Sequence, residues 1–137
     1  MVVAGRNEKL QKAMENLPPS VNLELRALGF VNHLDDLVAA SDLVITKAGG
    51  LIVSEVMARQ TPMVVIDPIP GQEEWNADYV VSVGAGVQIR LPEMVPIAVH
   101  NLLTSPERLE ALRLGASRAG RPQAALAVAD AILKVVG

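Results

Sequence analysis

Short aliphatic runs alternate with segments of helical spacing along this chain, and the alternation predicts its elements. Four runs are typical of buried strands, at residues 1–5, 42–46, 63–67 and 87–89. The segment NLELRALGFV (22–31) alternates apolar and polar residues less regularly and predicts a further strand. Asn7 is a suitable cap for a first helix, which Pro18 and Pro19 end because proline donates no backbone hydrogen bond.

Helices are expected between these strands. Apolar residues space helically in residues 8–17, 34–38 and 51–59, and again from residue 92 onward, and the segment 71–84 reads as a loop that leads into a helix. Strands separated by helices of about ten residues favour right-handed crossovers. We therefore expect one α/β domain over residues 1–137, with a Rossmann-like parallel sheet and helices on both faces.

In such a sheet, ligands bind beyond the carboxyl ends of the strands. Three loops with polar or glycine residues follow predicted strands, at residues 5–7, 47–50 and 69–73. The chemistry is expected in these three loops.

Composition narrows the classes of function. The chain has one Trp, one Tyr and one Phe, so its core must be aliphatic, and the lone Trp75 is expected to be a core anchor. The net charge is −3 and no Lys/Arg cluster stands out, which argues against a nucleic-acid partner. The chain has no cysteine and only two histidines, so neither a disulfide nor a metal site is expected. The absence of cysteine also suits a cytosolic protein. No apolar run approaches the roughly 20 residues that span a bilayer.

The turn TKAGG precedes the third predicted helix. Gly49 and Gly50 let the backbone approach a ligand, and free amides at a helix start favour an anion, but a tight turn alone would also explain both glycines. Lys47 could help to bind phosphate or merely flank the turn. Neither a P-loop nor a G-x-G-x-x-G fingerprint is present, so both familiar phosphate motifs are excluded.

Four further residues, at three places in the chain, each have two possible interpretations. Glu55 could hold the vicinal hydroxyls of a ribose or simply favour the helix dipole. Gln72 and Glu73, in the proline-framed segment PGQEEWNA, could bind sugar hydroxyls or belong to a solvated helix start. Arg6 could pair with phosphate or remain on the surface.

Taken together, GRN, ITKAGG and PGQEEWNA resemble, in order and spacing, the C-terminal half of a GT-B glycosyltransferase. The resemblance runs over nearly the full chain. It is closest to the monogalactosyldiacylglycerol synthase and processive diacylglycerol glucosyltransferase group. The N-acetylglucosaminyltransferase of the lipid-linked cell-wall precursor is related, but it usually has a Ser-Gly-Ala-type loop in place of residues 47–50.

The resemblance implies a nucleotide-sugar (UDP-sugar) binding domain over residues 1–137, with no cofactor and no metal. The diphosphate is expected on residues 48–54, the ribose on Glu55, the uracil beside Phe30 and Val31, and the donor sugar on Gln72 and Glu73. The implied substrate-binding residues are Gly5, Arg6, Phe30, Val31, Lys47, Ala48, Gly49, Gly50, Leu51, Ser54, Glu55, Gln72, Glu73 and Asn76.

The family's reaction is inverting transfer of a hexose from a UDP-sugar to a lipid acceptor such as diacylglycerol. The acceptor and the catalytic base belong to an N-terminal domain that this chain lacks, so we expect a fragment that binds donor but is inactive alone. The full-length enzyme is expected in the cytoplasm or at the cytoplasmic face of the membrane, as a peripheral membrane protein of glycolipid biosynthesis. A UDP-sugar epimerase half and a non-catalytic nucleotide-binding module remain as alternatives.

Overall fold

The structure is a computed structural model that describes residues 1–136. The chain falls into two compact units, one formed by Met1–Leu34 and the other beginning at Asp35. Each unit is described by itself. The single domain expected from the sequence stays a prediction, whereas the parallel α/β architecture is confirmed within both units.

The first unit is a small β-α-β arrangement. It contains β1 (Val2–Val3), α1 (Glu8–Glu15) and β2 (Ala27–Leu28), and the two strands pair in parallel. Asn7 caps α1 as expected, because its side chain accepts a hydrogen bond from the amide of Leu10 at 3.0 Å.

The strand expected over residues 22–31 is much shorter in the structure. Only Ala27–Leu28 forms a strand, and an isolated antiparallel bridge joins Ser20 to Leu23. The parallel ladder is limited by β1, which pairs only Val2 and Val3. Side-chain alternation alone therefore overestimated the length of this strand, because a strand extends only as far as its partner does.

The second unit contains a three-stranded parallel sheet and most of the helices. Its elements are α2 (Leu34–Ala39, which starts at the last residue of the first unit), β3 (Val44–Thr46), α3 (Gly50–Ala58), β4 (Met63–Ile66), α4 (Gln72–Ser82), β5 (Gly86–Ile89), η1 (Pro92–Met94), α5 (Val95–Leu103), α6 (Pro106–Ala119) and α7 (Ala124–Val136). The strand order is β3-β4-β5.

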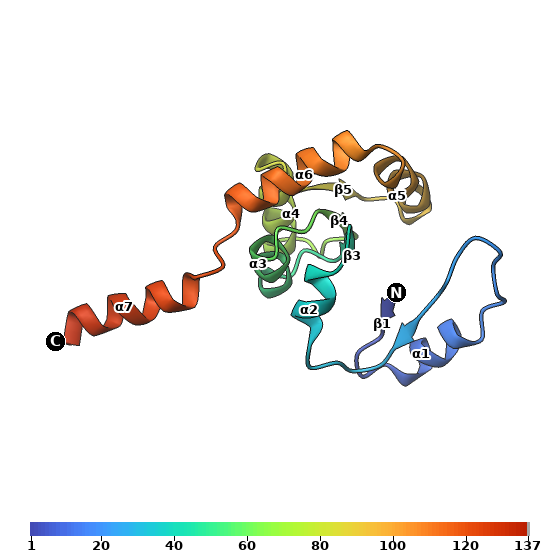
Figure 1. The fold of residues 1–137 in the computed structure, drawn as a ribbon, viewed down its shortest axis with the longest axis horizontal. Coiled ribbons are helices and arrows are strands. Elements are labelled where there is room, and N and C mark those ends of the chain that lie inside the picture. The colour runs from blue at the N-terminus through green and yellow to red at the C-terminus, as the bar shows by residue number, and fades with distance from the viewer. Residues whose placement is uncertain (137) are drawn as a thin grey trace. The chain divides into compact units, whose positions relative to one another are not determined.

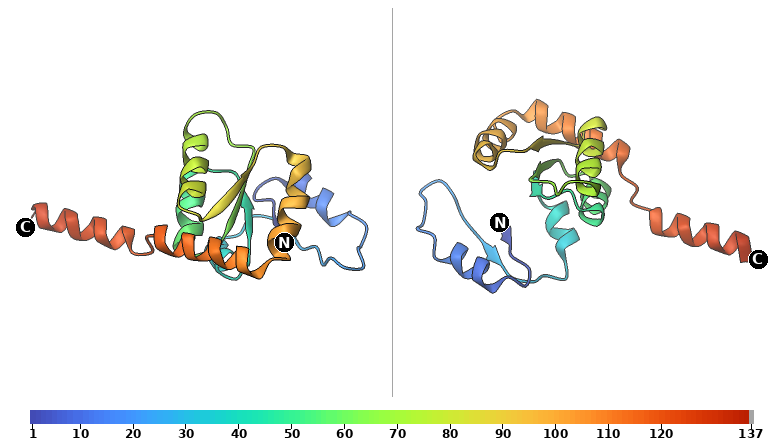
Figure 2. Two further views of the ribbon diagram at one scale, coloured as in Figure 1. Left: turned by 90° about the horizontal axis from the view of Figure 1, so that it is seen from above. Right: turned by 180° about the vertical axis from the view of Figure 1, so that it is seen from behind.

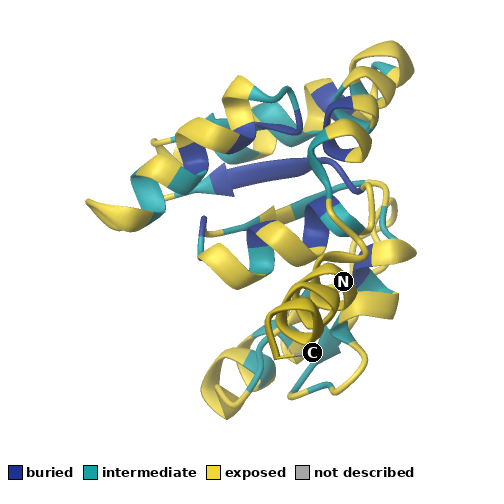
Figure 3. Cartoon of the chain, turned by 90° about the vertical axis from the view of Figure 1, so that its left-hand side faces the viewer, coloured by how far each residue is buried: buried dark blue, intermediate teal, exposed yellow. Residues whose placement is uncertain are grey.

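β4 is the centre of this sheet and of its core. Met63, Val64 and Val65 are fully buried, and β4 pairs with β3 on one side and with β5 on the other. Figure 3 shows the buried positions on this strand and on the helix faces that turn toward the sheet. A run of four aliphatic residues is what a strand covered on both faces requires.

The helices form layers around the sheet. α3 and α4 lie side by side on one face, and α5 lies on the opposite side (Figures 1 and 2). α6 crosses the turns that precede β4 and β5: an added Cβ at Gly115 would collide with the carbonyl oxygen of Gly84, and one at Gly120 with that of Met57. α6 thus closes the amino ends of these strands, and the carboxyl ends remain free for a site.

An ion pair joins α2 to the end of α3. The Nη2 of Arg59 donates a hydrogen bond to Oδ2 of Asp35, and this bond holds the pKa of Asp35 below its ordinary value. Because the pKa is lower in the folded chain, ionised Asp35 stabilises the fold above its unfolded-state pKa. That contribution is lost as the pH falls through the folded-state pKa.

The contact of α6 with the turn before β5 predicts that Gly115→Ala destabilises the chain. Overpacking against a backbone carbonyl costs about 1–3 kcal/mol, which exceeds the roughly 1 kcal/mol that alanine gains over glycine in a helix. Urea unfolding followed by circular dichroism measures the free energy of unfolding. The exposed Ser117→Ala on the same helix should change it by less than about 0.5 kcal/mol. An unchanged midpoint in Gly115→Ala would contradict the close packing.

The Arg59 hydrogen bond predicts a measurable titration shift. In an NMR titration of the side-chain carboxyl carbon, Asp35 should titrate below the ordinary range for aspartate. In Arg59→Gln the pKa of Asp35 should rise toward its ordinary value, while Arg118→Gln on α6 serves as a control that leaves it unchanged. The same pKa of Asp35 in wild type and Arg59→Gln would refute the assigned cause.

Candidate functional site

The candidate site lies at the carboxyl ends of β3 and β4. The two strands are parallel, with Thr46 opposite Val65, so the loops that follow them leave the sheet at the same edge. The side chain of Asn76 on α4 donates a hydrogen bond from Nδ2 to the carbonyl oxygen of the fully buried Ala48 at 2.8 Å. This bond ties α4 to the TKAGG turn and gives Asn76 a structural role there, while its expected contact with the substrate stays a prediction.

The amino end of α3 has no cap of its own. Gly49 occupies the N-cap in an extended conformation and makes no side-chain hydrogen bond, and no acidic side chain lies in the first turn. The first amides of the helix are therefore available to a ligand, and the positive end of the helix dipole favours an anion there. In contrast, α1 is capped by Asn7, and α4 carries Glu73 and Glu74 in its first turn.

Leu51, Ser54 and Glu55 lie on the outer face of α3. The inner face buries Val53 and Val56, whereas Leu51 and Glu55 are exposed. Ser54 donates from Oγ to the carbonyl oxygen of Gly50 at 2.9 Å, so its hydroxyl is engaged within the helix. Glu55 lies five residues beyond Gly50, or about 7.5 Å along the axis at 1.5 Å per residue. The carboxylate of Glu55 therefore lies further along the helix than its free first amides.

Gln72 and Glu73 lie on a helix, not in the loop that the sequence predicted. α4 begins at Gln72, because Gly71 occupies its N-cap with a φ of 101° and Glu74 accepts a hydrogen bond from the amide of Gly71 at 3.3 Å. Glu73 accepts a hydrogen bond from the amide of Ile69 at 2.8 Å. Its carboxylate thus fixes the loop after β4, while Gln72 is exposed at the start of α4.

Lys47 has a partner that the sequence analysis missed. Its Nζ lies 3.5 Å from Oδ2 of Asp67, the residue directly after β4. Asp67 has a φ of +40°, a left-handed backbone conformation that is uncommon outside glycine. Its position at the carboxyl end of a strand could be read from the sequence, but its pairing with Lys47 could not, because the pairing depends on the register of β3 and β4.

The expectation that Trp75 anchors the core is wrong. Trp75 is 76% exposed, and α4 buries Ala77 and Val80 instead. At 100° per residue, Trp75 lies about 200° from Ala77 and 140° from Val80 around the helix, so it faces away from the sheet. Among the described residues, the interior of this unit is mainly aliphatic, with Met57, Met63 and the polar Thr61 also buried.

The remaining predicted residues lie in the first unit. Gly5 has a φ of +59°, which suits glycine in the turn after β1. Within this unit the guanidinium of Arg6 lies over the ring of Phe30, 5.3 Å from its centroid, and Val31 follows. The structure therefore brings Arg6 and Phe30 together, at the carboxyl ends of β1 and β2. That one ligand contacts residues of both units stays a prediction.

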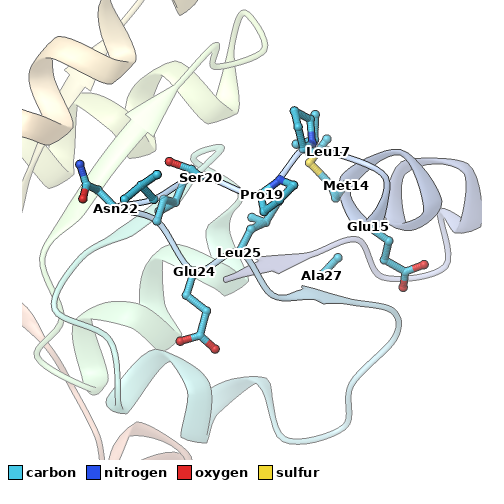
Figure 4. A pocket seen from close by; sticks show the side chains of 12 residues that line it. Met14, Glu15, Leu17, Pro19, Ser20, Asn22, Glu24, Leu25 and Ala27 are labelled. Carbon is cyan, nitrogen blue, oxygen red and sulfur yellow. The ribbon is translucent and has the colours of Figure 1, made fainter.

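A large cavity of about 900 Å³ also lies in the first unit, and it is separate from the predicted residues. Figure 4 shows that it is lined by the end of α1, the segment that follows and the first residue of β2, including Met14, Pro19, Leu25 and Ala27. None of the substrate-binding residues expected from the sequence lines it.

Within residues 1–136, no cluster of three or more His, Asp or Glu side chains is placed to hold a metal ion. Among the described helices, none combines the length and the apolar character needed to cross a membrane.

Comparison with known proteins decides the family. Residues 1–127 match the model of the glycosyltransferase family 28 C-terminal domain. The chain belongs to this family. The resemblance inferred from the motifs is thereby confirmed.

Curated relatives give the same result. The chain is 35% identical over 113 residues to the processive diacylglycerol beta-glucosyltransferase of Bacillus pumilus, a match that covers 82% of this chain and 30% of that protein. It is 32% identical over 133 residues to the enzyme of the same name from Bacillus cytotoxicus, covering 97% of this chain and 34% of that protein. The chain thus spans about a third of the length of the curated relatives it matches.

Solved structures agree on the fold. MurG of Acinetobacter baumannii, a GT-B enzyme, superposes with a TM-score of 0.70 at 26% identity, over 83% of this chain and 35% of that one. The glycotransferase of kitacinnamycin gives a TM-score of 0.53 at 23% identity, over 80% of this chain and 32% of that one. The Rossmann-like fold is that of GT-B glycosyltransferases.

The hydrogen bond from Asn76 predicts that Asn76→Ala loosens the TKAGG turn. The variant leaves the carbonyl oxygen of buried Ala48 without its partner, at a cost of about 1–3 kcal/mol. Amide hydrogen exchange should become faster for Val53, whose amide donates to the carbonyl oxygen of Gly49 at 3.0 Å. The exposed Asp78→Ala on the same helix serves as the control and should leave exchange unchanged. Equal protection in both variants would show that the bond does not hold the loop.

Proposed function

We propose that this chain binds the nucleotide-sugar donor, a UDP-sugar, of an inverting glycosyltransferase that moves a hexose to a lipid acceptor such as diacylglycerol. The observation that carries the proposal is the start of α3, where Gly49 leaves the first amides without a cap and the first turn has no carboxylate. A family 28 chain with such a helix end at the carboxyl edge of its sheet is suited to a diphosphate.

The diphosphate binds at Gly49 and Gly50, where the amides and the helix dipole stabilise its charge. Asn76 holds Ala48 through its hydrogen bond to the carbonyl oxygen of that residue, so the loop is in position before the ligand binds. Preorganised donors lose little free energy to reorganisation, and they are most useful where charge develops during reaction. In glycosyl transfer that charge develops on the departing diphosphate.

Glu55 accepts hydrogen bonds from the ribose hydroxyls, about one and a half turns beyond the phosphates. Gln72, exposed at the start of α4, contacts the hexose. Because Glu73 already binds the amide of Ile69, its part is to hold the loop after β4, and the sugar contact falls mainly to Gln72. That Phe30 and Val31 flank the uracil stays an expectation from the resemblance.

The acceptor hydroxyl must lose a proton as it attacks the anomeric carbon. We assign that base, and the lipid-binding surface, to polypeptide outside these residues, since the curated relatives are about three times as long. The contribution of this chain is to bind the donor and to stabilise the leaving diphosphate.

The epimerase alternative is less well supported. It needed an acid or base from Glu73 or Glu74. Glu73 accepts a hydrogen bond from the amide of Ile69, and Glu74 contacts both the amide of Gly71 and Arg90, so both carboxylates already have structural partners. The two curated relatives described above are both named as glucosyltransferases.

The proposal predicts that UDP binds this chain at α3. In an NMR titration, UDP should shift the amide signals of residues 49–55, and uridine without phosphate should shift them much less. A non-catalytic nucleotide-binding module would bind in the same way, so activity of the chain joined to an acceptor domain distinguishes that alternative. Absence of shifts at saturating UDP would refute the donor site.

The role of Glu55 predicts a specific loss in Glu55→Gln. The variant should bind UDP about tenfold more weakly, equivalent to roughly 1.4 kcal/mol, because an ionised acceptor of ribose hydroxyls is lost. It should also lose most of the preference of the wild type for UDP over 2′-deoxy-UDP. Isothermal titration measures both affinities, with the exposed Glu107→Gln on α6 as the charge-matched control. An unchanged preference would contradict the ribose contact.

A further inference from the structure

We propose that Asp67 is a positioning residue that acts as the counter-ion of Lys47, holding its ammonium group when no diphosphate is bound and recapturing it when the diphosphate leaves. The inference rests on the proposed function, because it concerns the same anion site. It assigns to Asp67 a role in the affinity for the diphosphate and in its release.

The first support is position. Lys47 directly follows β3 and Asp67 directly follows β4, two adjacent parallel strands. Their charged groups meet at 3.5 Å. The loop that begins with Lys47 runs through Ala48 and Gly49 into the uncapped start of α3. The ion pair therefore lies at the sheet edge from which the anion-binding helix begins.

The second support is the backbone of Asp67. Its φ of +40° is unusual for a residue with a side chain, and Pro68 follows it. Aspartate and asparagine tolerate this region better than other non-glycine residues. Unusual backbone conformations of this kind concentrate at ligand sites, where the surrounding structure holds them. Here the conformation sets the direction from which the carboxylate meets Lys47.

The third support is the exposure of the pair. The side chains of Lys47 and Asp67 are 51% and 72% exposed, so water screens their attraction and the pair is easily broken. A diphosphate carries more charge than one carboxylate and can take Lys47 from Asp67. Asp67 therefore keeps the affinity for diphosphate moderate, which favours release of the nucleotide product after transfer.

The test is a double-mutant cycle read with UDP, inorganic pyrophosphate and uridine. Asp67→Asn removes the charge and keeps a residue that tolerates the left-handed backbone. It should tighten binding of UDP and pyrophosphate about two- to fivefold, the range expected for breaking an exposed ion pair. Uridine, without phosphate, should bind as it does to the wild type. Stopped-flow measurement should show slower dissociation of UDP from Asp67→Asn.

The second arm shows whether Asp67 acts through Lys47. Lys47→Met should weaken binding of both anions, and adding Asp67→Asn to Lys47→Met should then change little. Asp42→Asn removes an exposed negative charge at the amino end of β3 and is the control, with no change expected. Circular dichroism verifies that each variant is folded.

The outcomes are separable. If Asp67→Asn tightens anion binding equally with and without Lys47, Asp67 repels the anion directly and the inference is overturned. If Asp67→Asn weakens UDP binding, Asp67 contacts the donor and the inference is again overturned. If pyrophosphate shifts the amide signals of residues 49–51 but UDP does not, the proposed function fails, and the cycle with pyrophosphate still decides the role of Asp67. If neither anion shifts them, both proposals fail.

Discussion

Parallel pairing on both sides of β4 is the constraint on which the rest of the second unit depends. Each peptide group of Met63–Ile66 faces a neighbouring strand that runs in the same direction, so the carboxyl ends of β3, β4 and β5 all lie at one edge. Full burial of Met63, Val64 and Val65 then fixes α3 and α4 on one face. At the opposite edge, glycines let α6 approach the backbone closely. One edge is closed by packing, and the other remains free for chemistry.

This arrangement explains why the start of α3 is suited to an anion. The start of α3 has neither a capping side chain nor an acidic first turn, so its amides keep their capacity to donate. The polar groups nearby are arranged to support the loop: Asn76 holds Ala48, and Glu73 holds Ile69. Some of the polar residues that the sequence analysis expected to bind the sugar therefore hold the backbone of a loop. Others have no such contact and remain able to bind a ligand.

The sequence predicted the order and type of the strands in the second unit because buried parallel strands leave a strong aliphatic pattern. It predicted the start of α3 because two glycines, Gly49 and Gly50, follow β3 after a short turn. It failed where a long-range partner decides the outcome. The strand ending near Leu28 is short because β1 is short, and α4 starts early because Glu74 reaches back to the amide of Gly71. The pairing of Lys47 with Asp67 depends on strand register, which no local pattern contains.

The outward orientation of Trp75 has a consequence for spectroscopy. It is the sole indole of the chain, and it is solvated in the native state. Its fluorescence emission in the native state is therefore already that of a solvent-exposed indole, and unfolding should change this emission little. The intrinsic fluorescence of this protein is thus a poor reporter of folding.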